Sequence, residues 1–131
     1  MVSFLEKSPQ EVIDALKPAN SIAILSCGLC PALQKKGGLI GIEKWKGFLE
    51  KEFCVKWTLT GPMMCDEVLW ITQFGDMLER LDDVDKLAVM TCKLGLELAE
   101  NLLGFDCVAC LVPEYTGTLM SDGTIRPSEY R

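Results

Sequence analysis

The sequence predicts an α/β fold: a single three-layer domain in which helices cover both faces of a four-stranded parallel sheet. Two observations predict it. Short apolar runs of strand length alternate along the chain with segments of helical spacing, which is typical of βαβ units. The 131 residues, 49% apolar and 24% charged, suit one domain with its own hydrophobic core. We therefore expect a single domain over residues 1–131.

An N-terminal helix comes first. Ser8 can cap it, with Pro9 at its first position and Glu11 three residues after the cap. This arrangement of residues commonly begins a helix. Pro18 cannot continue a helix, so the helix should end near Lys17.

Four apolar runs predict the strands of the sheet, at residues 21–26, 54–60, 86–91 and 108–112, the last ended by Pro113. Three stretches with helical spacing predict the helices between and after them, at residues 40–53, 66–80 and 93–103. Gly104 should cap the end of the last helix. Because the strands are parallel, all four should end at one edge of the sheet, and the connections between them should be right-handed.

The end of the chain, residues 116–131, differs from this pattern and predicts an irregular C-terminal arm or a small hairpin. Ser121-Asp122-Gly123 separates two short runs at residues 118–120 and 124–126. Such a sequence favours a tight turn between paired strands.

Composition excludes several classes of function. The chain has seven cysteines, no histidine and a net charge of −6. Without histidine it cannot contain a Ser-His-Asp triad, a Cys-His dyad or a His-ligated metal site. Ser26 has no visible base to activate it. The acidic balance counts against nucleic-acid binding.

The N-terminus shows no signal peptide, and no apolar run is long enough to span a membrane. We therefore expect a cytoplasmic protein that does not associate with membranes. Thiols stay reduced in the cytoplasm, and an odd number of cysteines fits a disulfide framework poorly.

Four cysteines should meet at the edge where the strands end. Cys27 and Cys30 follow the first predicted strand, Cys65 follows the second and Cys92 follows the third. Ligands of open parallel sheets bind outside the carboxyl ends of the strands. Four thiolates make a soft tetrahedral site that suits zinc or an iron–sulfur cluster.

Charges near this edge should favour ionised thiols. Helices are expected to begin just after Cys65 and Cys92, and a helix N-terminus stabilises a thiolate. Three lysines should also lie near this edge and offset the negative charge: Lys35, Lys36 and Lys93.

The remaining cysteines predict core packing: Cys54, Cys107 and Cys110. On a strand, Cys107 and Cys110 point to opposite faces, so they should not ligate one ion together. Two other interpretations stay open for the whole set. All seven thiols can be small core residues, and the C-x-x-C of Cys27 and Cys30 also resembles a thioredoxin-like redox pair.

The arrangement resembles a known family, the cysteine-rich C-terminal domain of methylenetetrahydrofolate reductase. In acetogens and related anaerobes this domain also occurs as a separate small partner subunit. The resemblance covers nearly the whole chain and is carried by short motifs, at Ser8–Leu16, Ile22–Cys30, Gly37–Gly38, Cys65–Asp66, Val89–Cys92 and Pro113–Gly117.

The resemblance implies an accessory subunit, not catalytic alone, of an oxidoreductase of one-carbon metabolism. Its cysteines would hold a 4Fe–4S cluster or zinc, and a cluster would pass electrons to the flavin of a methylenetetrahydrofolate reductase subunit. Two departures from the family pattern leave the cluster type and ligand count open. Gln34 stands where members carry a further cysteine, and Lys93-Leu-Gly95 replaces a glycine-rich stretch.

The sequence therefore predicts a metal-bearing electron-transfer subunit with Cys27, Cys30, Cys65 and Cys92 as ligands. A structural zinc-binding interaction domain without redox role is the first alternative. A thiol-disulfide protein that uses Cys27 and Cys30 is the second. We expect a protein partner, docked at the metal edge or through the C-terminal arm, and leave homo-oligomer formation open.

Overall fold

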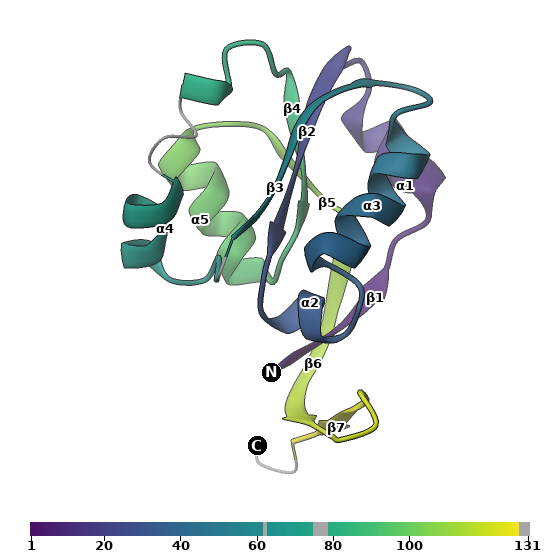
Figure 1. Ribbon diagram of the computed structural model, residues 1–131, viewed down its shortest axis with the longest axis vertical. Coiled ribbons are helices and arrows are strands. Elements are labelled where there is room, and N and C mark those ends of the chain that lie inside the picture. Colours follow the sequence, from purple (N-terminus) through teal and green to yellow (C-terminus); the bar gives the residue numbers. More distant parts are fainter. Residues whose placement is uncertain (62, 75–78, 129–131) are drawn as a thin grey trace.

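A sheet of four parallel strands runs through the middle of the molecule (Figure 1). The computed structural model describes residues 1–61, 63–74 and 79–128. The strands follow the order β3-β2-β4-β5, with bounds β2 Ser21–Cys27, β3 Cys54–Gly61, β4 Lys86–Met90 and β5 Cys107–Ala109. The predicted α/β fold with a four-stranded parallel sheet is confirmed.

Helices cover both faces of this sheet (Figure 1). Helices α1 (Pro9–Leu16) and α3 (Gly38–Leu49) pack on one face, and α4 (Glu67–Phe74) and α5 (Lys93–Leu103) pack on the other. The side chains of β2 alternate between the two cores: Ile22 and Ile24 face α1 and α3, whereas Ala23, Leu25 and Cys27 face α4 and α5. Period-2 alternation with both faces apolar explains why β2 reads as a continuous apolar run.

The helix ends follow their capping residues. Ser8 accepts a hydrogen bond from the N–H of Glu11 at 3.2 Å, and Gly104 adopts a left-handed conformation with φ +60° after α5. Helix α3 begins and ends earlier than predicted. Residues 75–78 of the predicted helix 66–80 lie outside the described residues, and α4 ends at Phe74.

A second sheet, which the sequence did not predict, packs beside the first. It is antiparallel and contains β1 (Val2–Glu6), β6 (Leu111–Leu119) and β7 (Ile125–Pro127), in the order β1-β6-β7. The fourth predicted strand exists as β5, but its predicted bounds 108–112 are wrong, because β5 ends at Ala109 and the chain enters β6 after Cys110. The N–H of Cys110 bonds to Val89 in the parallel sheet at 2.9 Å, and its carbonyl accepts from Lys7 at 3.0 Å. Cys110 is therefore the point where the chain changes sheets.

Pro113 lies inside β6 and does not end a strand, because it sits opposite Phe4 of β1 in the antiparallel pair. Strand β7 pairs with β6 only from Gly117 to Leu119. Pro113 therefore lies on a stretch of β6 with one neighbouring strand, where a missing N–H is tolerated.

The end of the chain forms the small hairpin that was one of the two expectations. Strands β6 and β7 are antiparallel, and the N–H of Met120 bonds to the carbonyl of Thr124 at 2.8 Å. Asp122 accepts from the N–H of Thr124 at 3.0 Å, and Gly123 has φ +88°. This hairpin projects from the body of the protein at the bottom of Figure 1.

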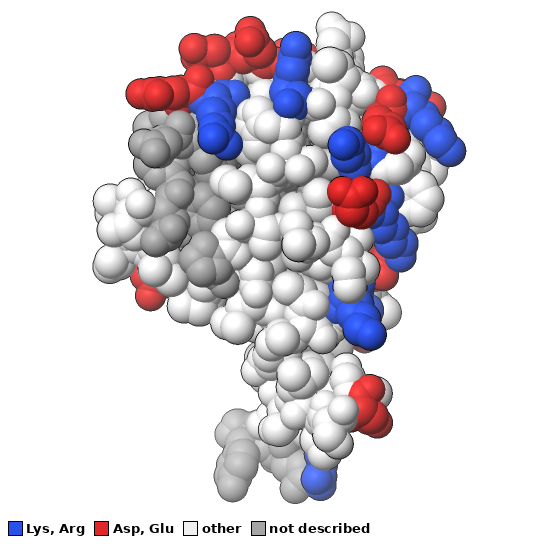
Figure 2. Space-filling model, in the orientation of Figure 1, with Lys and Arg blue, Asp and Glu red and all other residues white. Residues whose placement is uncertain are grey.

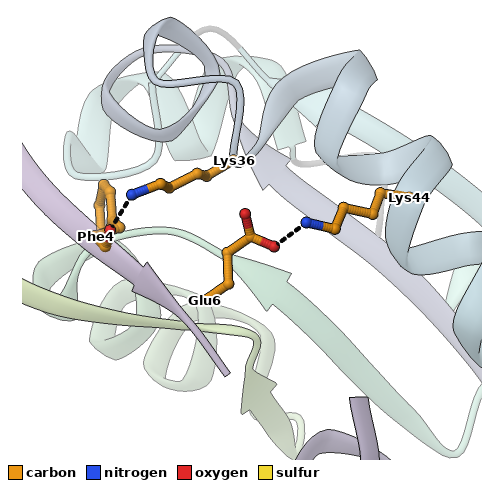
Figure 3. A network of polar contacts seen from close by, with 4 residues as sticks. All are labelled: Phe4, Glu6, Lys36 and Lys44. Atoms are coloured by element: carbon orange, nitrogen blue, oxygen red, sulfur yellow. Dashed lines mark hydrogen bonds and ion pairs between the residues drawn. The ribbon is translucent and has the colours of Figure 1, made fainter. Parts of the chain in front are cut away.

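Side chains from the segment after β2 fasten β1 to the rest of the protein (Figure 3). Lys36 donates to the carbonyl of Phe4 at 2.5 Å, and Lys44 forms an ion pair with Glu6. On its other side β1 pairs with β6. The N-terminal strand is therefore held from both sides.

Candidate metal centre

Three strand-to-helix junctions place the four predicted ligands at one edge of the parallel sheet. Cys27 is the last residue of β2, and Cys30 is the first residue of the short helix α2 (Cys30–Leu33). Cys92 is the N-cap of α5, just after β4, and Cys65 lies between β3 and α4. Since β2 stands between β3 and β4, the three junctions are neighbours in space.

The loop that carries Cys65 touches the Cys27 thiol directly. Cys27 is only 5% exposed, and the backbone N–H groups of Leu29 and Met64 donate hydrogen bonds to its sulfur. Burial raises the pKa of Cys27, these two hydrogen bonds lower it, and the nearby thiols of Cys30 and Cys92 raise it further. The net shift is upward, so burial favours the neutral thiol of Cys27.

Cys65 also has a raised pKa, which contradicts the expectation that the following helix favours its thiolate. The first cause is burial, followed by the nearby thiols of Cys92, Cys27 and Cys30. The helix end is already occupied, because Asp66 accepts a hydrogen bond from the N–H of Leu69 at 3.1 Å. A carboxylate at that position uses the favourable end of the helix dipole.

The thiols surround the end of β2 and do not meet at one point. Cys30 and Cys92 pack against the core on the α1 and α3 side, while Cys27 belongs to the core on the α4 and α5 side. Within the described residues, no three Cys, Asp or Glu side chains are close enough together to hold a single metal ion. The other thiols are nevertheless near enough to raise the pKa of both Cys27 and Cys65.

A close contact between backbones sets this edge. A Cβ on Gly28 would lie 2.1 Å from the carbonyl oxygen of Gly61, so only glycine lets the ends of β2 and β3 approach. Ser26, which is fully buried, donates to the carbonyl of Cys27 at 3.0 Å and accepts from the N–H of Gly38 at 2.8 Å. Its hydroxyl is therefore a structural link between β2 and α3.

The lysines near the thiol edge were expected to offset the negative charge of the thiolates, but they do not contribute to the pKa shifts of Cys27 and Cys65. Lys36 donates to the carbonyl of Phe4 in β1. Lys93 lines a hollow of about 310 Å³ together with Cys92 and Tyr115. The charges that shift the pKa values of Cys27 and Cys65 are those of other thiols, and no lysine contributes.

All seven cysteines are free of disulfides, and the other three only partly match the expected core packing. Cys110 is fully buried and Cys107 is half-buried, and burial raises the pKa of each to about 12. They pack into cores on opposite faces, as expected. Cys54 is exposed at the start of the edge strand β3, so the expectation is wrong for it.

One residue at the site had no role in the sequence-based picture. The Gln34 amide donates to the carbonyl of Cys30 at 2.9 Å and also bonds to the backbone of Val2 and Phe4. No local pattern points to this role, because its partners in β1 are about thirty residues earlier in the chain.

Comparison with protein-family models, with curated proteins and with solved structures finds no match to this chain. The similarity to the methylenetetrahydrofolate reductase domain therefore stays a prediction from the sequence. Across the part of the chain that the structure describes, no helix has the length and apolar character needed to cross a bilayer.

Proposed function

We propose that the protein carries an iron–sulfur cluster on Cys27, Cys30, Cys65 and Cys92 and passes electrons as an accessory subunit of an oxidoreductase. The observation that carries this proposal is that three neighbouring strand-to-helix junctions, after β3, β2 and β4, bring these four cysteines to one edge of the parallel sheet. The cluster would supply one-electron chemistry, and the chain itself supplies the thiolates and the backbone donors.

The arrangement of the thiols fits a single tetrahedral ion poorly. A tetrahedral zinc site, with Zn–S bonds of about 2.3 Å, needs its sulfurs close together around one point. The four thiols instead surround the end of β2, and no three of the described acidic or thiol side chains are grouped for one ion. A cluster is wider than an ion, and N–H donors to sulfur tune its potential.

The structural zinc domain remains the alternative, since four cysteines without histidine also suit closed zinc sites. The thiol-disulfide alternative is less well supported. A reactive redox thiol is exposed and has a lowered pKa, whereas Cys27 is 5% exposed and its pKa is raised by burial.

The partner that the resemblance favours is a flavin-containing methylenetetrahydrofolate reductase subunit. Large apolar side chains are exposed on the loop and helix starts at the thiol edge: Leu29, Leu33, Leu39, Ile40 and Leu94. The acidic residues before β4 lie at the opposite edge, and Figure 2 shows charged groups gathered away from the centre of the face drawn. This cluster of exposed apolar side chains favours a protein partner at the thiol edge, and the net charge of −6 counts against nucleic acid. Free thiols suit a cytoplasmic location.

Metal analysis of protein purified without oxygen tests the proposal. Iron, sulfide and zinc are measured on one sample. A brown protein with equal amounts of iron and sulfide is the expected result. A colourless protein with one zinc per chain would overturn the cluster in favour of the structural alternative.

Association is tested separately by co-expression with the flavin-containing reductase subunit and gel filtration. Leu94→Asp places a charge at the thiol end of α5, and Leu102→Asp places the same charge at the other end. Both leucines are exposed in the isolated chain, at 62% and 37%. We expect only Leu94→Asp to prevent co-elution. Equal behaviour of the two variants would overturn docking at this edge.

A further inference from the structure

We propose that Gln34 is the positioning residue for Cys30, and that it makes the N-terminal strand β1 part of the thiol site. The inference rests on the proposed function only in treating Cys30 as a ligand. It concerns where the Cys30 backbone is held, so it can be tested without any metal.

The Gln34 carboxamide joins Cys30 to two residues of β1. Its Nε2 group donates to the carbonyl of Cys30 at 2.9 Å and to the carbonyl of Val2 at 2.5 Å. Its Oε1 atom accepts from the N–H of Phe4 at 3.2 Å. Two acceptors face the amide nitrogen and one donor faces the oxygen, so the network is consistent with only one orientation of the amide.

Gln34 takes the place of a neighbouring strand for β1. Strand β1 is at the edge of its sheet, with β6 as its partner on the other side. In place of a strand, Gln34 bonds to the carbonyl of Val2 and the N–H of Phe4, and Lys36 donates to the carbonyl of Phe4. Buried backbone groups need such partners, because leaving them unpaired costs free energy.

Among the described residues, the Cys30 carbonyl accepts a hydrogen bond from the Gln34 side chain, whereas the carbonyls of Leu29 and Pro31 accept from backbone N–H groups. Helix α2 has four residues, and its N-cap Leu29 provides no side-chain hydrogen bond. Gln34 is the C-cap of this helix, and its side chain bonds both to the first carbonyl of the helix and to β1, so it links the Cys30 backbone to β1. Movement of β1 would move Cys30 with it.

The test compares two variants that both weaken the attachment of β1. Gln34→Met removes the link to Cys30 and to β1, whereas Lys36→Met removes only a link to β1. The metal-free folded proteins are alkylated with iodoacetamide, and peptide mass spectrometry follows Cys30. The exposed Cys54 gives the reference rate in the same molecule.

We expect Gln34→Met to raise the rate at Cys30, relative to Cys54, about fivefold, as loss of one hydrogen bond predicts. Lys36→Met should change this ratio by less than about twofold, although both variants lower the melting temperature. Equal ratios in the two variants, or an unchanged ratio in Gln34→Met, would overturn the proposal. If Gln34→Met does not fold, Gln34→Asn, which is one methylene too short, takes its place.

The iron content of the same variants separates this inference from the proposed function. A wild-type protein that binds no iron, with the Cys30 effect present, overturns the proposed function and supports the positioning role. A wild-type protein that binds iron, with no Cys30 effect in the Gln34 variant, overturns the positioning role alone.

Discussion

The backbone N–H of Met64 donates a hydrogen bond to the sulfur of Cys27. Met64 belongs to the loop after β3, and Cys27 is the last residue of β2. The two residues are 37 positions apart in the sequence, and their contact exists because β2 and β3 pair in parallel up to Cys27 and Gly61. The geometry of the thiol edge therefore depends on the register of the sheet.

Replacement of Gly28 by alanine should disturb that register. The added Cβ would lie 2.1 Å from the carbonyl oxygen of Gly61, so one of the two backbones must move. We expect Gly28→Ala to lower the free energy of unfolding by about 1–3 kcal/mol, as overpacking does elsewhere, in urea denaturation. Gly47→Ala is the matched control, because nothing lies within 4 Å of its Cβ position in α3. It should raise stability by about 0.5–1 kcal/mol, and similar losses in both variants would contradict the account.

The buried Cys110 thiol should make the protein less stable at alkaline pH. Burial raises its pKa from 9.0 to about 12 in the folded state. Below pH 9 the thiol is neutral in both states, so this cost is absent. Between these two values the unfolded chain ionises and the folded chain does not, which lowers stability by about 1.4 kcal/mol per pH unit.

Denaturation measured across this pH range checks the effect. Cys110→Ala should show a shallower alkaline decline than the wild type, whatever its stability at neutral pH. Cys54→Ala, with an exposed side chain, is the control and should keep the wild-type slope. Parallel curves for Cys110→Ala and the wild type are incompatible with a thiol held neutral in the core.

Asp85 should stabilise the amino end of the sheet at neutral pH. Its carboxylate accepts from the N–H groups of Asn20 and Ser21 at 2.9 and 3.1 Å, and these bonds lower its pKa below 3.8. The stabilisation is present above 3.8 and is lost as the pH falls through the lowered pKa of the folded state. Asp85→Ala should therefore lower the melting temperature at neutral pH and lose this difference in stronger acid.

The control for the melting temperatures of Asp85→Ala is the variant Asp82→Ala, on the same loop. Asp82 is exposed, and its side chain makes no hydrogen bond with the described residues. A melting temperature for Asp85→Ala equal to that of Asp82→Ala at every pH would contradict a role for the Asp85 carboxylate.

The parallel sheet could be predicted from the sequence because its signals are local. The apolar run of β2 and the caps at Ser8 and Gly104 each act within a few residues. Strand β1 could not be predicted in this way, because its pairing partner β6 begins more than a hundred residues later. The change of sheet at Cys110 depends on hydrogen bonds to Val89 in the parallel sheet and to Lys7, the residue just after β1.

In the candidate site too, the placement of the cysteines could be predicted from the sequence, but their spacing could not. Topology alone placed Cys27, Cys30, Cys65 and Cys92 at one edge, and the strand order agrees with that placement. Their spacing depends on contacts between distant segments, such as the approach of Gly28 to Gly61 and the bonds of Gln34 to β1. Burial and the nearby thiols of Cys92 and Cys27 raise the pKa of Cys65, and Asp66 accepts the hydrogen bond at the helix end that the thiol was expected to use.

Metal content of single-cysteine variants tests the central claim most directly. Cys65→Ser and Cys92→Ser each remove one thiol of the edge, and Cys54→Ser removes an exposed thiol at the other end of β3. All are purified without oxygen and assayed for iron, sulfide and zinc beside the wild type. The account predicts that Cys54→Ser keeps the wild-type content and that both edge variants lose it. Wild-type metal content in Cys65→Ser and Cys92→Ser, or no bound metal in any sample, would contradict a metal centre at this edge.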